Sequence, residues 1–516
     1  MPPPVPLPGK PIYLPHVLAS GLQLKPDDPA LVSTKACSNW REMELASSRY
    51  AANLLAVGLR PGDRVASLMP NCDTLVIHYL ACLKSGIVAT PLNYRYMPPE
   101  IDHALEASGA SLLLAHSERN ADIAASKVAR QLPLGVIGCG ANGSLPTVEA
   151  LLERPAENGA LPTPAPTDPA VIFFTSGSTG PAKGVTHSLE SLGWVIASFA
   201  QRCEITVHDV ILPGMSLSHI AGFLNTFMGL AAGARVIVTR GFTGRELLPL
   251  LRDHRPTVLN MLPAALFGLV RDHDAVREDF ASIRLCISGG DKVPADLRRA
   301  FTTLAGSAIV EVYGVSETGN ATLALPYTFD KMGSVGRPLA GYQLSIRDER
   351  GNELPTGAQG SLWVKSPSNM IGYWNDPEAT RATMKDGWLD TGDVMRLDDD
   401  GYFWFCGRHK QIIVHDGSNI SPQEVEDALI DHPAIASAGV VGVRDLAHGE
   451  NVCAFVTLKQ GATPPAPHAL IEFARARVGY KAPENLFVLA QMPLNTTGKV
   501  DRATLKKLAE ERLSGR

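Results

Sequence analysis

The stretch from Val171 to Ser188, V-I-F-F-T-S-G-S-T-G-P-A-K-G-V-T-H-S, places glycines, hydroxyl side chains and a lysine directly after an apolar run. Glycine lets backbone N–H groups approach an anion closely, hydroxyl groups donate further hydrogen bonds, and lysine adds a positive charge. These residue types suit a loop that binds phosphate groups. An ordinary Ser/Gly turn on the surface has a similar composition, so the stretch by itself leaves both interpretations open. The residues concerned are Thr175, Ser176, Gly177, Ser178, Thr179, Gly180 and Lys183.

Two common nucleotide-binding motifs do not fit this stretch. The P-loop pattern G-x-x-x-x-G-K-[ST] needs a glycine before its lysine and a hydroxyl residue after it. Lys183 instead follows Ala182 and precedes Gly184. The dinucleotide pattern G-x-G-x-x-G is also absent from the stretch. If the loop binds phosphate, it belongs to another class of nucleotide-binding loop.

The composition of the chain excludes several classes of protein. It has 516 residues, of which 45% are hydrophobic and 19% charged, and its net charge is −5. No long Lys/Arg block provides a footprint for nucleic acid, and no window approaches the ~18 apolar residues that cross a bilayer. The proline-rich start is not typical of a signal peptide, and the 8 cysteines include no C-x-x-C pair. We therefore expect a soluble, cytoplasmic protein with reduced thiols and no nucleic-acid partner.

Short apolar runs alternate with helical patterns along much of the chain. Residues 62–70 predict a strand, residues 71–86 carry apolar side chains at helical spacing, and residues 87–92 predict the next strand. This alternation indicates an α/β fold with largely parallel sheets. Val171 to Phe174 would form one of the buried strands, so the candidate phosphate loop would directly follow a strand. Further strands are predicted around residues 234–239, 257–262, 283–288 and 308–313.

The pattern changes twice in the later part of the chain. From about Gly333, short β-like runs such as S-L-W-V-K and Y-F-W-F-C are separated by turn residues, which indicates a β-rich subdomain. After Arg408, a helix is predicted to begin at an N-cap Ser421, with Pro422 at its first position and Glu424 three residues after the cap. About a hundred residues with their own strands and helices predict a small second domain.

Four further motifs accompany the candidate loop. The pattern T-S-G-S-T-G-x-x-K-G resembles the signature of the adenylate-forming superfamily, which comprises acyl-CoA synthetases, adenylation domains of peptide synthetases, and luciferases. The other motifs of that superfamily follow in the same order and extend the resemblance over nearly the whole chain. They are V-Y-G-V-S-E-T-G at 312–319, W-L-D-T-G-D at 388–393, C-G-R-H-K-Q-I-I at 406–413 and N-T-T-G-K-V-D-R at 495–502.

The resemblance implies a fold and a reaction. The fold is a large N-terminal α/β domain, residues 1–408, with mainly parallel sheets flanked by helices plus a β-rich subdomain, followed by a small mobile α+β C-terminal domain, residues 409–516. In the reaction, a carboxylate attacks the α-phosphorus of ATP to give an acyl-adenylate and pyrophosphate, and a thiol then displaces AMP. The implied substrates are ATP, a carboxylic acid and coenzyme A, with Mg²⁺ as the metal.

The resemblance also assigns roles in the first half-reaction. The 175–184 loop would hold the β- and γ-phosphates with the help of Lys183, Glu317 would hold magnesium, and the Ser316 hydroxyl would lie near the α-phosphate. Tyr313 and Gly314 would contact the adenine, and Asp393 and Arg408 would contact the ribose. Taken alone, an Asp in T-G-D is usually a turn residue and a single Arg is usually a surface residue, so only the accompanying motifs support the two ribose assignments.

Three residues of the last domain would act in the change between the two half-reactions. Lys499 resembles the mobile lysine that bridges carboxylate and phosphate during adenylation. Lys410, two residues after the ribose-contacting arginine, corresponds to the hinge about which the small domain rotates. Gly417 would face the pantetheine arm of coenzyme A. The sequence departs from the superfamily at Gln411, where Asp is common, and at Asp416, which leaves the lining of the pantetheine tunnel open.

The carboxylate pocket corresponds to G-M-S-L-S-H-I-A-G-F and I-S-G-G-D-K-V-P. His219 and Phe223 would line it, although a histidine among apolar residues is as often part of a core. Gly290 and Asp291 would form a wall shared by the acyl group and the adenine. The sequence offers no clear Arg or Lys for a second carboxylate and no acidic residue for an ammonium group. A hydrophobic monocarboxylate, either a fatty or an aromatic acid, is therefore expected.

The resemblance is strongest to acid–CoA ligases of the fatty-acyl and aryl type. A free-standing ligase that loads a carrier-protein pantetheine is the main alternative, and a non-catalytic acyl-nucleotide sensor is a weaker one. The combination of Glu317, Lys499 and the phosphate loop favours an enzyme over a sensor. Luciferase activity is remote. The sequence leaves the oligomeric state open, with a homodimer among the alternatives.

Overall fold

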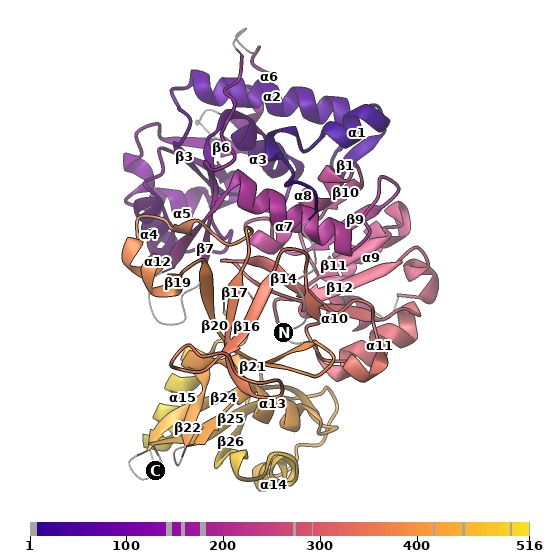
Figure 1. The fold of residues 1–516 in the computed structure, drawn as a ribbon, viewed down its shortest axis with the longest axis vertical. Coiled ribbons are helices and arrows are strands. Elements are labelled where there is room, and N and C mark those ends of the chain that lie inside the picture. Colours follow the sequence, from indigo (N-terminus) through magenta and orange to yellow (C-terminus); the bar gives the residue numbers. More distant parts are fainter. Residues whose placement is uncertain are drawn as a thin grey trace. The chain divides into compact units, whose positions relative to one another are not determined.

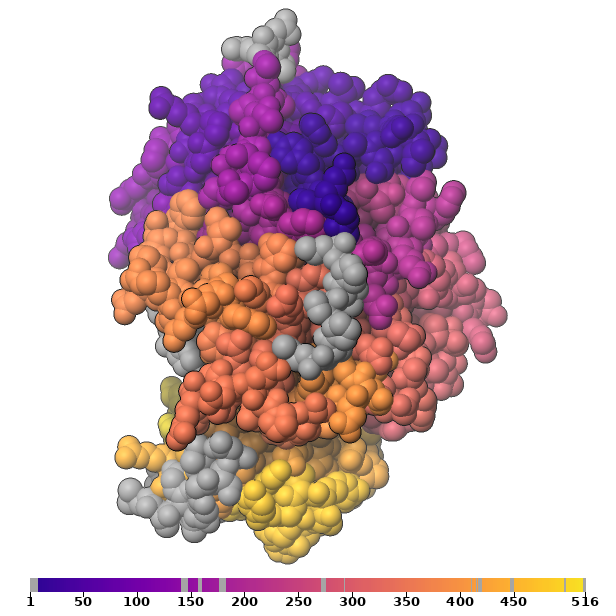
Figure 2. Space-filling view, viewed as in Figure 1, coloured from indigo at the N-terminus to yellow at the C-terminus, as the bar shows by residue number. Residues whose placement is uncertain are grey.

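The structure is a computed structural model that describes residues 8–140, 147–155, 160–175, 182–271, 275–291, 293–415, 418–445, 449–495 and 498–514 (Figure 1). It divides into two compact units. The first comprises Met1–Leu344 and Trp363–Leu389, and the second comprises Ser345–Leu362 and Asp390–Arg516. In the space-filling view, the indigo N-terminal segment covers one end of the first unit (Figure 2).

A nine-stranded sheet lies in the first unit. Its strand order is β15-β14-β13-β12-β11-β9-β10-β1-β2. The six strands from β13 to β1 run parallel. Edge strand β2 pairs antiparallel with β1, β14 pairs antiparallel with β13, and the other edge strand, β15, pairs antiparallel with β14. The strands are β1 (Pro29–Ser33), β2 (Cys37–Asn39), β9 (Val210–Gly214), β10 (Arg235–Val238), β11 (Val258–Met261), β12 (Leu285–Gly289), β13 (Ile309–Val315), β14 (Gly319–Leu323) and β15 (Arg337–Pro338).

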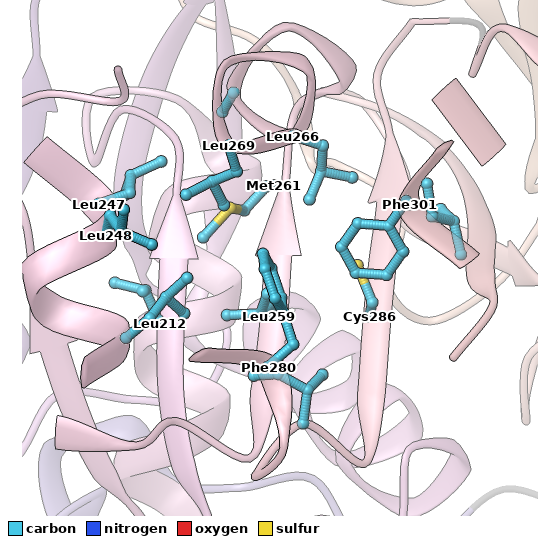
Figure 3. Close-up of a cluster of buried hydrophobic side chains, with 14 of the residues drawn as sticks. Leu212, Leu247, Leu248, Leu259, Met261, Leu266, Leu269, Phe280, Cys286 and Phe301 are labelled. Carbon is cyan, nitrogen blue, oxygen red and sulfur yellow. The ribbon is translucent and has the colours of Figure 1, made fainter. Parts of the chain in front are cut away.

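Helices α9 (Gly244–His254), α10 (Pro263–Arg271) and α11 (Ala295–Ala305) pack their apolar side chains against this sheet. Figure 3 shows the cluster, in which Leu212, Leu259 and Cys286 of the strands meet Leu247 and Phe301 of the helices. This burial supplies the main driving force for docking the helices on the sheet. Helices α1 (Ala19–Leu24) and α8 (Ile220–Ala231) also belong to this part of the unit.

A seven-stranded sheet also lies in the first unit, with the order β18-β8-β7-β4-β3-β5-β6. Strands β3 to β7 are parallel, β8 pairs antiparallel with β7, and β18 pairs antiparallel with β8. The strands are β3 (Arg64–Leu68), β4 (Val88–Pro91), β5 (Leu112–His116), β6 (Val136–Cys139), β7 (Pro169–Thr175), β8 (Lys183–Ser188) and β18 (Gly372–Tyr373). The helices are α2 (Trp40–Ala56), α3 (Asp73–Ser85), α4 (Pro98–Ser108), α5 (Asn120–Ala125), α6 (Val148–Glu153), α7 (Leu189–Arg202) and α12 (Pro377–Thr383).

The predicted α/β alternation is confirmed. The strand, helix and strand expected at 62–92 are β3, α3 and β4. Helix α3 ends at Gly86, whose φ of 70° lies in the left-handed region that glycine adopts without steric cost. The buried strand predicted at Val171 to Phe174 lies within β7, where these side chains are almost fully buried.

The two β-like runs expected after Gly333 are also strands. S-L-W-V-K lies in β17 (Gln359–Lys365), and Y-F-W-F-C overlaps β21 (Phe403–Arg408). With β16 (Gln343–Arg347), β19 (Met384–Lys385) and β20 (Trp388–Leu397), they form a five-stranded sheet of order β16-β17-β20-β19 in which β21 pairs with β20. The predicted β-rich subdomain is therefore present.

The last hundred residues form an α+β arrangement, as predicted. Its sheet has the order β23-β22-β25-β24, with β26 paired to β25. Ser421 does occupy the N-cap of α13, but its side chain makes no capping bond and donates instead to the carbonyl oxygen of Cys406. The elements are β22 (Ile413–His415), β23 (Ser418–Ile420), β24 (Ile435–Asp445), β25 (Gly449–Leu458), β26 (Asn485–Val488), α13 (Pro422–Ile430), α14 (Pro467–Val478) and α15 (Arg502–Ser514).

The structure also describes the cysteines and the lengths of the helices. All eight cysteines lie in described residues as free thiols, and Cys37 is exposed whereas five are buried. Of the helices that the structure describes, none is long and apolar enough to span a membrane. Short 3-10 helices complete the fold: Leu14–His16, Ser117–Arg119, Ala129–Gln131, Arg277–Phe280, Phe329–Lys331, His409–Gln411 and Gly479–Lys481.

Candidate active site

The two described ends of the candidate phosphate loop lie side by side. Thr175 ends β7 and Lys183 begins β8, and the two residues are partners in the antiparallel ladder. The Lys183 side chain is 49% exposed, and its Nζ lies 4.0 Å from Asp376 Oδ2 and 5.1 Å from the centre of the Tyr373 ring. The structure therefore places a cation at the mouth of the loop. Ser176, Gly177, Ser178, Thr179 and Gly180 lie outside the described residues.

Several other predicted residues follow the carboxyl ends of neighbouring parallel strands. The sheet order β13-β12-β11-β9 puts these ends along one edge. Ser316 follows β13, Gly290 and Asp291 follow β12, and His219 comes five residues after the end of β9. In open α/β sheets, ligands bind at this edge of the strands. The topology thus brings together residues that the sequence assigned to the adenylate and to the acyl group.

The turn between β13 and β14 contains Ser316 and Glu317. Its backbone carbonyl groups accept hydrogen bonds from other segments of the chain. His187 Nε2 donates to the Ser316 carbonyl oxygen at 2.8 Å, so this nitrogen carries the proton. The Met370 N–H donates to the Glu317 carbonyl at 2.7 Å, and the Tyr342 hydroxyl donates to the Thr318 carbonyl at 2.8 Å. Three successive carbonyl groups are therefore fixed by three segments that are distant in sequence. Such a turn presents its side chains in a preorganised position.

His187 is completely buried beneath this turn. Burial lowers the pKa of its imidazole to about 4, although the hydrogen bond to Ser316 acts in the opposite direction. At neutral pH the ring is uncharged, so it serves as a neutral hydrogen-bond donor. Its other nitrogen, Nδ1, lies 3.1 Å from the Ser191 hydroxyl oxygen.

The Glu317 carboxylate accepts a hydrogen bond from the Tyr373 hydroxyl, with 2.8 Å between Oε1 and the phenol oxygen. Burial and the nearby Glu317 charge both raise the pKa of Tyr373, so the phenol stays protonated and can donate. Neither Tyr373 nor His187 was identified from the sequence. One sequence feature could have pointed to Tyr373. Residues 371–380 combine aromatic and acidic residues that have no assigned role, in the stretch I-G-Y-W-N-D-P-E-A-T.

Tyr313 and Gly314, expected at the adenine, lie at an irregular point of the β13–β14 ladder. The Tyr313 side chain is mostly buried. A Cβ atom at Gly314 would come within 2.3 Å of the Gly319 carbonyl oxygen, so this position has no room for a side chain. Gly290 adopts a φ of 75° directly after β12, and both Gly290 and Asp291 are exposed. Glycine is therefore favoured at position 314 because a side chain has no room there, and at position 290 because the backbone is left-handed.

The residues expected at the acyl group differ in burial. His219 is partly buried and precedes α8 as its N-cap. Phe223 is completely buried, stacks on Phe227 with ring centroids 4.1 Å apart, and meets Tyr79 edge-on at 5.4 Å. Phe223 is thus part of an aromatic core beside the expected pocket. The assignment of both residues to the acyl group remains a prediction.

In the second unit, Asp393 and Arg408 are partners in the β20–β21 ladder. Arg408 Nε lies 2.8 Å from Asp393 Oδ1, and the carboxylate is buried while the guanidinium is 44% exposed. The structure therefore joins the two residues that the sequence assigned to the ribose. A buried carboxylate that is neutralised by a guanidinium keeps an acceptor at a fixed place.

The backbone of Lys499 is hydrogen-bonded to Asn495. The Asn495 N–H donates to the Lys499 carbonyl at 2.7 Å, and the Lys499 N–H donates to Asn495 Oδ1 at 3.0 Å. Leu494 and Val500 form an antiparallel bridge, and Lys499 is exposed. The backbone of Lys410 lies in the 3-10 helix His409–Gln411. Gly417 is outside the described residues.

The donor set around Glu317 suits magnesium only with substrate phosphates present. Within the part of the chain that the structure describes, no group of three His, Cys, Asp or Glu side chains is placed to hold a metal. Magnesium is commonly bound by one or two carboxylates together with phosphate oxygens and water. A single carboxylate fixed by a phenol, near the ammonium of Lys183, fits that mode.

Comparison with known proteins is consistent with this geometry. A family model described as AMP-binding enzyme matches residues 19–374, and one described as AMP-binding enzyme C-terminal domain matches residues 424–499. The chain is 31% identical over 494 residues, 94% of both proteins, to the fatty acid–[acyl-carrier-protein] ligase ScoC of Streptomyces coeruleorubidus. It is 30% identical to the long-chain-fatty-acid–CoA ligase of Bacillus subtilis (strain 168), an alignment that covers 98% of this chain and 95% of that relative.

Solved structures give the same result. The crystal structure of ATP-bound MatB from Rhodopseudomonas palustris superposes with a TM-score of 0.89 at 28% identity, covering 96% of this chain and 99% of that one. The fold and the site thus define an adenylate-forming enzyme. The chain belongs to the AMP-binding enzyme family and is an AMP-forming ligase of the acyl-CoA synthetase type.

Proposed function

We propose that this protein is an acid–CoA ligase that activates a hydrophobic monocarboxylate as its acyl-adenylate. In the first half-reaction, a carboxylate oxygen forms a bond to the α-phosphorus of ATP, and the bond from that phosphorus to the bridging oxygen breaks to release pyrophosphate. In the second, the sulfur of coenzyme A bonds to the acyl carbon, and AMP leaves with the carboxylate oxygen. The thiol proton passes to solvent.

The observation that carries the proposal is the held turn at Ser316 and Glu317. Its three carbonyl groups are fixed by hydrogen bonds, and Tyr373 contacts both the Glu317 carboxylate and the ammonium of Lys183. Glu317 would hold magnesium, which when bound would draw charge from the phosphate oxygens. Lys183 offsets charge on the leaving pyrophosphate, and the Ser316 hydroxyl donates toward the α-phosphate. Fixed donors and charges of this kind stabilise the five-coordinate phosphorus without further reorganisation.

The predicted residues of the last part of the chain also have roles in this proposal. The pair of Asp393 and Arg408 would bind the ribose hydroxyl groups, because the buried carboxylate offers fixed acceptors. Lys499 would bridge the carboxylate and the phosphate during adenylation. Lys410 would be the hinge between a domain of residues 1–408 and one of residues 409–516, and Gly417 would face the pantetheine arm.

The acid class rests on the apolar surroundings of α8. Phe223, Phe227 and Met228 are all buried there, and these aromatic and apolar side chains suit a fatty or aromatic acid rather than one with a second charge. The named specificities of the two curated relatives, for a fatty acid and for a long-chain fatty acid, support the same class. Phe223 and His219 would border the acyl chain, and Gly290 and Asp291 would separate it from the adenine.

A pyrophosphate-release screen of aliphatic and aromatic acids tests the proposal. With coenzyme A present, at least one hydrophobic acid is expected to give equal amounts of pyrophosphate, AMP and acyl-CoA. Formation of ADP in place of AMP would contradict the whole assignment.

A carrier-protein acceptor is the second candidate, because the relative from Streptomyces coeruleorubidus is named as a ligase for an acyl-carrier protein. The same screen separates the two candidates. Pyrophosphate release without any acyl-CoA, together with acylation of an added phosphopantetheinyl carrier protein, would favour the second.

A further inference from the structure

Tyr373 contacts both charged side chains that the reaction uses in the first unit. Its hydroxyl donates to Glu317 Oε1 at 2.8 Å, and the Lys183 Nζ lies over its ring, 5.1 Å from the centre. We propose that Tyr373 is a positioning residue that fixes the Glu317 carboxylate and the Lys183 ammonium relative to each other. Both groups can then bind ATP and its magnesium ion at the same time. This inference rests on the function proposed above.

The segment that carries Tyr373 is itself hydrogen-bonded to both partners. Tyr373 lies in β18, which pairs with β8, the strand that begins at Lys183. The Ile371 N–H donates to the Thr186 carbonyl at 2.9 Å, and the Trp374 N–H donates to the Gly184 carbonyl at 2.7 Å. One residue before this pairing, the Met370 N–H donates to the Glu317 carbonyl at 2.7 Å. The backbone of residues 370–374 therefore joins the phosphate-loop strand to the metal-binding turn.

The side chain of Tyr373 orients the two charged side chains that this backbone segment connects. A carboxylate has two oxygens with about four lone-pair sites, so Glu317 can accept from the phenol and still offer lone pairs to a cation. The phenol thereby fixes the rotation of the carboxylate. The negative face of the ring attracts the ammonium of Lys183, which is also 4.0 Å from Asp376 Oδ2. The ring and the hydroxyl thus act on different charges and can be separated by substitution.

Tyr373→Phe keeps the ring and removes the hydroxyl, whereas Tyr373→Leu removes both. In Tyr373→Phe, the Mg²⁺ concentration that gives half-maximal pyrophosphate release is expected to rise roughly tenfold, because a hydrogen bond to a charged group is lost. The KM for ATP at saturating Mg²⁺ should stay near that of the wild type. Tyr373→Leu should raise that KM as well, since Lys183 loses its contact with the ring.

A binding measurement accompanies the kinetics. ATP is titrated calorimetrically into each protein, without acid, at several Mg²⁺ concentrations. The gain in ATP affinity with Mg²⁺ is expected to be smaller in Tyr373→Phe than in the wild type. Tyr13→Phe is the matched control, because it removes a phenol that donates to the Pro164 carbonyl at 2.7 Å, and the Tyr13 ring meets that of His16; neither Pro164 nor His16 is a predicted site residue. It should behave as the wild type does in both measurements.

The outcomes are distinguishable. An unchanged Mg²⁺ dependence in Tyr373→Phe, in both kinetics and titration, would overturn the positioning role, whether or not the thermal midpoint falls. If the wild type activates no acid at all, the proposed function fails, and the titration alone still decides the role of Tyr373.

Discussion

Lys499 is exposed, and its backbone is fixed by hydrogen bonds to Asn495. Lys499→Ala is expected to lower adenylate formation by at least about 100-fold, because a charge that bridges the two reactants is lost. It should spare thioester formation from a supplied acyl-adenylate. Pyrophosphate release and acyl-CoA formation are measured separately, with Lys507→Ala as the control, because Lys507 is exposed on helix α15. Equal loss of both half-reactions would contradict the role of Lys499.

The neutral His187 beneath the Ser316 turn makes the protein sensitive to acid. Its folded-state pKa of about 4 lies below the usual value near 6.5, so the unfolded chain binds the proton first as the pH falls. This contribution to stability is complete above about pH 6.5 and is lost progressively down to about pH 4. It corresponds to about 3 kcal/mol in the free energy of unfolding.

His187→Gln tests this pH dependence, since a glutamine amide can still donate to the Ser316 carbonyl. Between pH 6.5 and pH 4, the thermal midpoint of the variant should fall less steeply than that of the wild type. His468→Gln serves as the control, because the His468 side chain is 84% exposed. A variant whose midpoint follows the wild-type curve over this range would show that His187 does not titrate as described.

The motifs in the sequence predict residues for the reaction, but they do not predict the residues that contact and hold them. Asp393 and Arg408, 15 positions apart, were assigned together through their motifs, and the ladder register joins them. Tyr373 and His187 were not assigned, although one contacts Glu317 and the other Ser316. Their partners are 56 and 129 positions away, and such contacts exist only once the sheet is assembled.

At the level of elements, the β13–β14 hairpin depends on the absence of a side chain at Gly314. Gly314→Ala would place a Cβ 2.3 Å from the Gly319 carbonyl oxygen and 2.9 Å from Asn320 Cα. Both are backbone atoms of the partner strand, so the hairpin must open. We expect a loss of about 1–3 kcal/mol in stability and a larger loss of ATP affinity, because Tyr313 moves with the strand.

Thermal unfolding and ATP titration check the Gly314 prediction. Gly9→Ala is a suitable control, since no atom lies within 4 Å of the added Cβ. Wild-type ATP affinity in Gly314→Ala would show that the hairpin does not shape the nucleotide site.

The alternation of strands and helices was predictable because each helix buries one apolar stripe and each strand is a short apolar run. The spacing located β3, α3, β4 and β7 correctly. The same spacing carries no information on strand order, so the separation into a nine-stranded and a seven-stranded sheet was not foreseen. Strand β18 illustrates the difficulty, because its two residues pair with β8, which lies almost 190 positions earlier.

At the scale of the whole chain, the two units are interleaved in sequence. Residues 363–389 belong to the first unit although residues of the second unit flank them on both sides. Turn residues and β-like runs continue through residues 363–389 without a change in composition. The sequence pattern therefore does not indicate that this segment belongs to the first unit. Tyr373, which contacts Glu317, lies within this returning segment.

The proposed hinge at Lys410 predicts different effects on the two half-reactions. Its backbone lies in a short 3-10 helix, and Lys410→Pro would restrict φ at that position. We expect the thiol step to slow by at least about tenfold while adenylation changes little, because the dihedral change between the two arrangements is blocked. Single-turnover measurements of each step provide the comparison, with Lys410→Ala as the control that keeps backbone freedom. Parallel loss in both steps would count against a hinge.

The distribution of the thiols should allow one cysteine to be labelled selectively. Cys37 is exposed, whereas burial raises the pKa of Cys72 and Cys203 to about 12 and suppresses their thiolate forms. A maleimide dye should therefore attach first at Cys37, without any engineering of the chain. Because Cys37 lies on edge strand β2, at the end of the sheet opposite β13 and β14, the labelled enzyme should keep its catalytic surfaces unmodified.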